Sequence, residues 1–210
     1  MKTNVFPLPI ALFTLLAFSL ICSCSATVIT FDDISPSPPS VYIGNITNGY
    51  QGLGWVNFAA INVPLETSEY GTNGDYYGMV SPPNIAINGF GNPAEIDSSG
   101  SNFNFLSTYL TGVWRSNLNI EVQGFSGTNL LYDQTVVVNA TNPTLFTFDY
   151  LDIDRLTFNS FDGQNAGFTG NGYQFAMDNL TLEFIPEPSS LLLATVGALL
   201  LWPLLKRKRA

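Results

Sequence analysis

The sequence contains no histidine, and both of its cysteines, Cys22 and Cys24, lie near the N-terminus in an apolar stretch. Without histidine there is no Ser-His-Asp triad and no Cys-His dyad, and nearly all zinc sites are excluded as well. If the N-terminal stretch is removed by cleavage, the rest of the chain has neither a disulfide nor a thiol nucleophile. Enzymes of these common classes are therefore not expected.

Basic residues are also scarce, with seven in the chain against sixteen acidic residues. Between residues 27 and 184 the sequence has two basic residues, Arg115 and Arg155, and fifteen acidic ones, a formal net charge of −13. Such a segment repels nucleic-acid phosphates, so no nucleic-acid partner is expected. The same charge keeps an exported protein soluble, and it also attracts divalent cations.

The N-terminus has the pattern of a secretory signal peptide. A basic start at Lys2 is followed by an apolar run over residues 5–22, and small residues precede Thr27. This pattern predicts a signal peptide over residues 1–26. Two alternatives stay open: an uncleaved membrane helix, which the prolines in the run disfavour, and a lipoprotein signal in which Cys24 carries the lipid.

The C-terminus carries the most specific motif of the chain, Pro186-Glu187-Pro188. An apolar stretch over residues 189–205 follows it, and a basic cluster over residues 206–209 comes next. As a helix with about 1.5 Å rise per residue, the apolar stretch spans roughly 25 Å, the short end of what crosses a bilayer. The basic cluster would stay on the cytoplasmic side, which places the preceding domain outside the cell.

This arrangement resembles the PEP-CTERM sorting domain, also called the ice-binding-protein C-terminal domain. The resemblance covers residues 185–209. It implies a transient anchor in the inner membrane, recognised at the Pro-Glu-Pro motif by an exosortase, a membrane cysteine protease of bacteria that secrete extracellular polysaccharide. After processing, the protein would be at the cell surface or outside the cell. An ordinary transmembrane tail is the alternative.

Residues 27–184 show strand alternation rather than helical periodicity. Leu118, Ile120 and Val122 alternate with polar residues, as in a half-buried strand, and a run rich in β-branched residues follows over 130–138. Many short runs of this kind, separated by Gly, Asn and Pro, predict an all-β fold, a single β-sandwich domain of jelly-roll type. No internal repeat is present, which argues against a solenoid.

This domain resembles a family that is often found upstream of such sorting domains. The resemblance rests on four segments, at residues 29–33, 52–58, 109–114 and 175–180. It implies a fold like that of the β-sandwich carbohydrate-binding modules, without a settled activity.

The predicted last strand contains an irregularity. Phe175 and Met177 share one face by alternation, whereas the apolar residues from Leu180 onward share the other face. The inward face therefore switches at Asp178-Asn179. A switch of this kind predicts a β-bulge, which places an extra residue in one strand and re-aims its side chains.

Three acidic residues form the candidate metal site. The first and last strands of jelly-roll modules commonly lie close together, so we expect Asp32 or Asp33 to approach Asp178. Calcium is bound by six to eight oxygen atoms, mainly from carboxylates and carbonyls, and these three residues supply several. The sequence thus predicts a structural calcium ion. The alternative is that these carboxylates sit at turns and accept backbone hydrogen bonds.

Aromatic residues give a second candidate site, for an extracellular polysaccharide. Tyr70, Tyr76 and Tyr77 lie in a segment rich in Gly, Asn and Tyr that is predicted to be a loop. Tyrosine rings in exposed loops stack well on sugar rings. Trp55 and Trp114 lie in apolar runs instead and are expected in the core.

The acidic residues do not identify a catalytic pair. Glycosidases use two carboxyl groups in one cleft. With fifteen acidic residues, chance pairs are inevitable, so Glu66, Glu69 and Asp75 carry no information in the sequence. We therefore expect a non-enzymatic component of the cell surface or extracellular matrix. The first alternative is a carbohydrate-binding module, and the second is a secreted hydrolase.

Overall fold

The computed structural model describes residues 25–35, 43–98 and 100–185. The predicted signal peptide over 1–26 and the predicted sorting segment over 185–209, with its Pro-Glu-Pro motif and its helix, lie almost entirely outside the described residues. In the part of the chain that is described, no helix is both long and apolar enough to cross a membrane.

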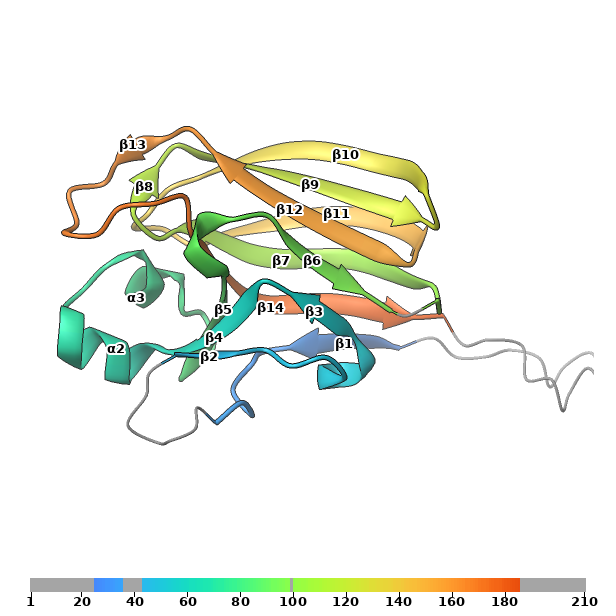
Figure 1. Ribbon diagram of the computed structural model, residues 1–210, viewed down its shortest axis with the longest axis horizontal. Helices are drawn as coiled ribbons and strands as arrows, with labels where there is room; N and C mark the ends of the chain where they lie inside the picture. The colour runs from blue at the N-terminus through green and yellow to red at the C-terminus, as the bar shows by residue number, and fades with distance from the viewer. Residues whose placement is uncertain (1–24, 36–42, 99, 186–210) are drawn as a thin grey trace, which may run out of the picture.

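Two antiparallel β-sheets form the domain (Figure 1). The larger, seven-stranded sheet consists of β1 (Ala26–Ile29), β2 (Ile43–Asn45), β4 (Phe58–Asn62), β5 (Asn84–Asn88), β7 (Phe103–Gly112), β11 (Thr144–Ile153) and β14 (Phe175–Phe184). Its strand order is β11-β7-β14-β5-β4-β2, and β1 pairs with β14.

The second, five-stranded sheet has the order β10-β9-β12-β6-β3. Its strands are β3 (Gly54–Val56), β6 (Ala94–Asp97), β9 (Leu118–Ser126), β10 (Asn129–Val138) and β12 (Arg155–Phe161), and a short separate pair is formed by β8 (Arg115–Ser116) and β13 (Gln164–Asn165). The predicted all-β sandwich is confirmed. Two short 3-10 turns, η2 (Tyr50–Gly52) and η3 (Gly89–Gly91), occur in its loops.

Two helices that the alternation pattern does not predict connect β4 to β5. They are α2 (Val63–Tyr70) and α3 (Gly74–Gly78). The second helix takes up most of the segment predicted to be a loop, and it packs against β7 and β14 of the larger sheet.

The core lies between the two sheets and is rich in aromatic rings. Phe58 and Phe105 of the larger sheet both contact Phe158 of the smaller one edge to face, with ring centroids 5.8 and 6.4 Å apart. Alternate residues of β9, namely Leu118, Ile120 and Val122, are buried in this core as predicted. Edge-to-face contacts between aromatic rings stabilise the packing of the two sheets by more than the burial of apolar area alone would.

The structure confirms the predicted bulge in β14. Phe175, Met177 and Leu180 are all fully buried in the core, and the pairing of β14 with β7 shifts register after Asp178. Asn179 has a φ of 51°, the left-handed backbone conformation that a bulge residue often adopts. Before the bulge β14 pairs with β5, and after it with β1, so the first and last strands are neighbours as expected.

Asp178 holds the segment that leads into β5. Its carboxylate accepts hydrogen bonds from the backbone N–H groups of Val80 and Ser81, each at 2.7 Å, and from the Ser81 hydroxyl at 2.9 Å. The N–H of Asn179 donates a fourth, at 2.7 Å. Burial raises the pKa of Asp178, and these four donors work against that rise by stabilising the charged form.

The other two predicted calcium ligands have partners of their own. Asp32 Oδ1 accepts the N–H of Asn84 at 3.0 Å, and Asp33 Oδ1 accepts the hydroxyl of Tyr50 at 2.6 Å. Among the described residues, no group of three or more Asp, Glu, His or Cys is placed to hold a metal ion. The observed contacts are those of hydrogen-bond acceptors, and calcium coordination stays a prediction.

The role of Asp178 is tested by the variant Asp178→Ala. We expect a loss of about 2–4 kcal/mol in the free energy of unfolding, because two partly buried backbone N–H groups lose their acceptor and the fully buried Asp178 side chain leaves a cavity. At about 2–4 °C per kcal/mol for a domain of this size, thermal melting should report a fall of several degrees or more. Asp133→Ala, on an exposed position of β10, is the matched control and should change little.

Repeating these melts in calcium and in a chelator tests the metal site. Equal melting temperatures in both buffers fit carboxylates that serve N–H and O–H donors. A calcium-dependent rise that disappears in Asp178→Ala would show that the three acids bind the ion instead.

Candidate functional site

A cleft lies over the outer face of the larger sheet. Side chains alternate along β4, so that Phe58 and Ala60 face the core while Ile61 faces the other way, with Ile87 of β5 beside it in a second hydrophobic cluster. The volume of the cleft is about 340 Å³, near the lower end of the roughly 300–1,000 Å³ typical of small-molecule sites.

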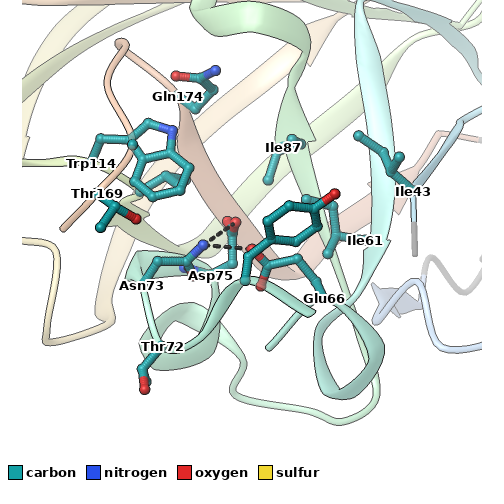
Figure 2. A pocket seen from close by; sticks show the side chains of 13 residues that line it. Ile43, Ile61, Glu66, Thr72, Asn73, Asp75, Ile87, Trp114, Thr169 and Gln174 are labelled. Carbon is teal, nitrogen blue, oxygen red and sulfur yellow. Dashed lines mark hydrogen bonds between the residues drawn. The ribbon is translucent and has the colours of Figure 1, made fainter. Parts of the chain in front are cut away.

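The residues that line the cleft come from three parts of the chain (Figure 2). An apolar wall comes from the larger sheet, a polar floor from the α2–α3 region, and a third side from the segments that follow β7 and precede β14. In that order the residues are Ile43, Ile61 and Ile87; Glu66, Tyr70, Thr72, Asn73 and Asp75; and Val113, Trp114, Thr169, Gly170 and Gln174.

Asn73 shapes the floor of the cleft. Its side-chain oxygen caps α3 by accepting the N–H groups of Asp75 at 2.9 Å and Tyr76 at 3.4 Å. The side-chain nitrogen therefore points the other way, and it donates to Glu66 Oε1 at 2.6 Å and to Asp75 Oδ2 at 3.4 Å. One amide thus brings together a carboxyl group from α2 and another from α3, as the dashed lines in Figure 2 show.

Close backbone packing fixes α3 beside the end of β7. The N–H of Gly74 donates to the carbonyl of Val113 at 3.0 Å. A Cβ atom at Gly74 would lie 2.0 Å from the carbonyl oxygen of Gly112, so only glycine fits there. This contact places Asp75, the next residue, close to the segment that follows β7 and contains Trp114.

Glu66 and Asp75 are acidic side chains that are almost completely buried, with 4% and 2% of their surface exposed. Glu66 Oε2 and Asp75 Oδ1 are buried, and neither has a hydrogen-bond partner within residues 25–35, 43–98 and 100–185. Burial, followed by the nearby Glu66 carboxylate, raises the pKa of Asp75 to about 8, against the lowering effect of the Asn73 amide. Burial also raises the pKa of Glu66. These shifts favour the protonated form of each carboxyl group unless a cation neutralises the pair.

Trp114 and Tyr70 supply the aromatic surface of the cleft. Trp114 is half-buried, contrary to the expectation that it lies in the core, and the backbone of Gly170 packs against its ring so closely that a Cβ there would lie 2.5 Å from ring atoms. Tyr70 is 57% exposed. Trp55 does lie in the core, where its indole N–H donates to the carbonyl of Tyr50 at 3.0 Å.

The three tyrosines predicted to bind a ligand do not act together in the structure. Tyr70 lines the cleft, but Tyr76 borders a separate hollow beside Met79, and Tyr77 stacks on Phe168 with ring centroids 6.4 Å apart. Sequence reasoning missed the acid pair. Its one local signal is the helix-capping pattern Asn73-Gly74-Asp75, which shows where α3 starts but not which acid lies across from it.

No protein-family model matches the chain, so the resemblance of residues 185–209 to the PEP-CTERM sorting domain gains no support from that comparison, and no curated protein matches either. Several solved structures are similar. A DUF4465 family protein from Bacteroides ovatus has 10% sequence identity and a TM-score of 0.45, over 77% of this chain and 100% of its own.

Carbohydrate-binding modules are also among the similar structures. A mutant of a family 29 module has 15% identity and a TM-score of 0.37, over 77% of this chain and 93% of its own. A family 61 module solved with a galactotriose has 8% identity and a TM-score of 0.31, over 67% of this chain and 94% of its own. Scores and identities this low carry no argument about function, which has to come from the cleft itself.

The raised pKa of Asp75 predicts how stability depends on pH. A carboxyl group with a higher pKa in the folded state stabilises the fold fully below the unfolded pKa, near pH 4, and this contribution is lost as the pH rises toward 8. Urea unfolding at pH 5 and pH 8 should therefore show a smaller loss of stability for Asp75→Asn, which stays neutral, than for the wild type. Glu69→Gln, at an exposed position of the preceding helix α2, should behave as the wild type does. An equal loss in Asp75→Asn would mean that Asp75 does not titrate in this range.

Proposed function

We propose that this protein binds an extracellular polysaccharide that lacks acidic groups, in the cleft over the outer face of the larger sheet. One observation carries the proposal: Trp114 and Tyr70 line the same cleft as Glu66 and Asp75, and each of these acids has a buried carboxyl oxygen with no hydrogen donor among the described residues. Sugar rings have apolar faces that stack on aromatic side chains, and hydroxyl groups that donate to such oxygens. A glycan therefore fits both surfaces of the cleft at once.

The charge of the domain selects against acidic glycans. The two arginines of residues 27–184 are both engaged: the Arg115 guanidinium donates to the carbonyls of Gly163 and Gly172, and Arg155 pairs with Glu95 at 3.2 Å. An acidic sugar in the cleft would thus lie near the carboxyl groups of Glu66 and Asp75. The residues that line the cleft include no lysine or arginine that could pair with its charge. Repulsion by the −13 charge of the segment adds to this effect.

The protein is proposed to bind its glycan without cleaving it. A glycosidase needs one carboxyl group that stays ionised, as nucleophile or base, beside one that is protonated as the acid. In the cleft, burial raises the pKa of both Glu66 and Asp75, so their surroundings do not shift the two pKa values in opposite directions, as an acid and a base would require. Release of reducing sugar from a bound oligosaccharide would contradict this part of the proposal.

Binding is tested with the purified full-length chain and a panel of neutral, amino and acidic polysaccharides. We expect saturable binding to a non-acidic member, and at least about a tenfold weaker affinity in Trp114→Ala, a loss of about 1.4 kcal/mol. Tyr76→Ala is the matched control, since Tyr76 is 46% exposed but lies outside the cleft. Tyr70→Ala gives a second variant at an exposed position, in case the tryptophan change disturbs folding. Equal affinities in all four proteins would place the binding surface elsewhere.

We further propose that the glycan is met outside the cell, as the two ends of the sequence predict. A signal peptide over residues 1–26 would export the chain, and an exosortase would recognise Pro186, Glu187 and Pro188 before the helix over residues 189–205. The protein would then be a non-enzymatic component of the cell surface or matrix whose function is to bind extracellular polysaccharide.

Mass spectrometry of the protein released by a host with an exosortase tests the sorting step. The C-terminus should lie near Pro186-Glu187-Pro188, and Glu187→Ala should leave the chain in the membrane fraction. Ser190→Ala is a suitable control, because it changes a residue outside the motif. Full-length protein that stays in the membrane of such a host would refute processing at this motif.

A further inference from the structure

Among the residues that the structure describes, no basic side chain pairs with the two acids at the floor of the cleft. Asn73 gives one N–H to each of Glu66 and Asp75, and the remaining oxygens, Glu66 Oε2 and Asp75 Oδ1, have none. Both side chains are more than nine-tenths buried, and they line the cleft from the α2–α3 side (Figure 2). Two buried carboxyl groups side by side are costly unless a cation or protons neutralise them.

The surroundings of the pair indicate what kind of cation fits. Calcium takes six to eight oxygen ligands, whereas two carboxyl groups supply at most four, and the Asn73 oxygen is already used by two N–H groups. An ammonium group needs only a few acceptors for its three N–H donors, and it is attracted to aromatic faces. Trp114 and Tyr70 line the same cleft and offer such faces.

We propose that the pair formed by Glu66 and Asp75 is a subsite for an ammonium group, so that the preferred glycan carries free amino groups. This inference rests on the proposed function and specifies its ligand. The ammonium group donates to Glu66 Oε2 and Asp75 Oδ1, while the rest of the sugar lies against the aromatic side chains. The raised pKa values of both carboxyl groups fit an acid pair whose cation comes with the ligand.

Chemistry of this kind separates three related glycans. An N-acetylated amino sugar has the same ring but no charge, and its amide nitrogen keeps one N–H donor where the ammonium group has three. A glucose polymer has a hydroxyl group there instead. Loss of the charge removes the attraction to the pair, and hydrogen bonds to charged groups are about twice as strong as neutral ones.

The test is isothermal titration of the full-length chain with chitosan oligomers, chitin oligomers and cello-oligosaccharides of equal length. We expect chitosan oligomers to bind at least about tenfold more tightly than the other two. Asp75→Asn and Glu66→Gln, which keep the size of the side chain, should remove this preference, so that chitosan oligomers bind these variants no more tightly than the uncharged oligomers do. Glu69→Gln removes a charge from an exposed position of α2, the helix that also contains Glu66. It therefore reports attraction by net charge alone and should keep the preference.

The outcomes separate the two proposals. Equal binding of amino and N-acetylated oligomers, with weakening in Trp114→Ala, would overturn the ammonium subsite and leave glycan binding intact. If Asp75→Asn and Glu69→Gln lose the preference for chitosan oligomers to the same extent, the preference comes from net charge alone. That result would also overturn the ammonium subsite. A calcium-induced rise in melting temperature that Asp75→Asn abolishes would assign the pair to a metal ion instead. Failure of every oligomer and of the polysaccharide panel would remove both proposals.

Discussion

Buried carboxyl groups in a domain with almost no basic residues are the constraint on which this structure depends. Removing a carboxylate from water is costly, and the usual remedy, a buried ion pair, is scarce in a segment with two arginines. The fold meets this cost in two different ways. Asp178 is surrounded by four donors, whereas Glu66 and Asp75 share a single amide and keep two oxygens without a partner.

The first remedy is architectural. The bulge in β14 lies where that strand passes from pairing with β5 to pairing with β1. At this junction Asp178 accepts the N–H groups of Val80 and Ser81, and Asp32 accepts that of Asn84. Since Pro82 and Pro83 have no N–H, these acceptors serve each backbone donor of the segment. The entry into β5, and with it the return of the chain from α3, is therefore held by the last strand and by the turn that follows the first strand.

The hydrogen bonding of Glu66 and Asp75 is incomplete, and this incompleteness distinguishes the candidate site. The α2–α3 excursion is short and lies against the outer face of the larger sheet, where the contact of Gly74 with the end of β7 sets its position. As a result, two acids, one amide and the side chain of Trp114 meet over an apolar wall. The proposed function rests on this incompleteness, because a purely structural site would satisfy its buried polar groups internally, and because aromatic side chains of the kind found beside them stack on sugar rings.

The sequence by itself determined the features that depend on near neighbours along the chain. Alternation in β9 gave the buried face of that strand, and the parity switch at Asp178-Asn179 located the bulge, because strand side chains have a period of two residues. Composition likewise excluded histidine chemistry from the whole sequence and cysteine chemistry from residues 27–184. Among the three candidate tyrosines, the sequence included the one that lines the cleft, Tyr70, but had no means of separating it from its neighbours.

Only the tertiary structure decided which groups meet across long separations. Asp178 accepts N–H groups that lie 97 and 98 residues earlier in the chain, and no local pattern records such a contact. In the sequence, nothing distinguishes Glu66 and Asp75 from the other acidic residues among the fifteen. In the fold, the turn between α2 and α3 brings both carboxyl groups within hydrogen-bond distance of the Asn73 side chain. Trp114 stands in an apolar run, and its place at the cleft follows from the packing of α3 and Gly170 around it. Burial is a property of the assembled surface, which is why the pairing of two acids and the exposure of one ring could be determined only by the fold.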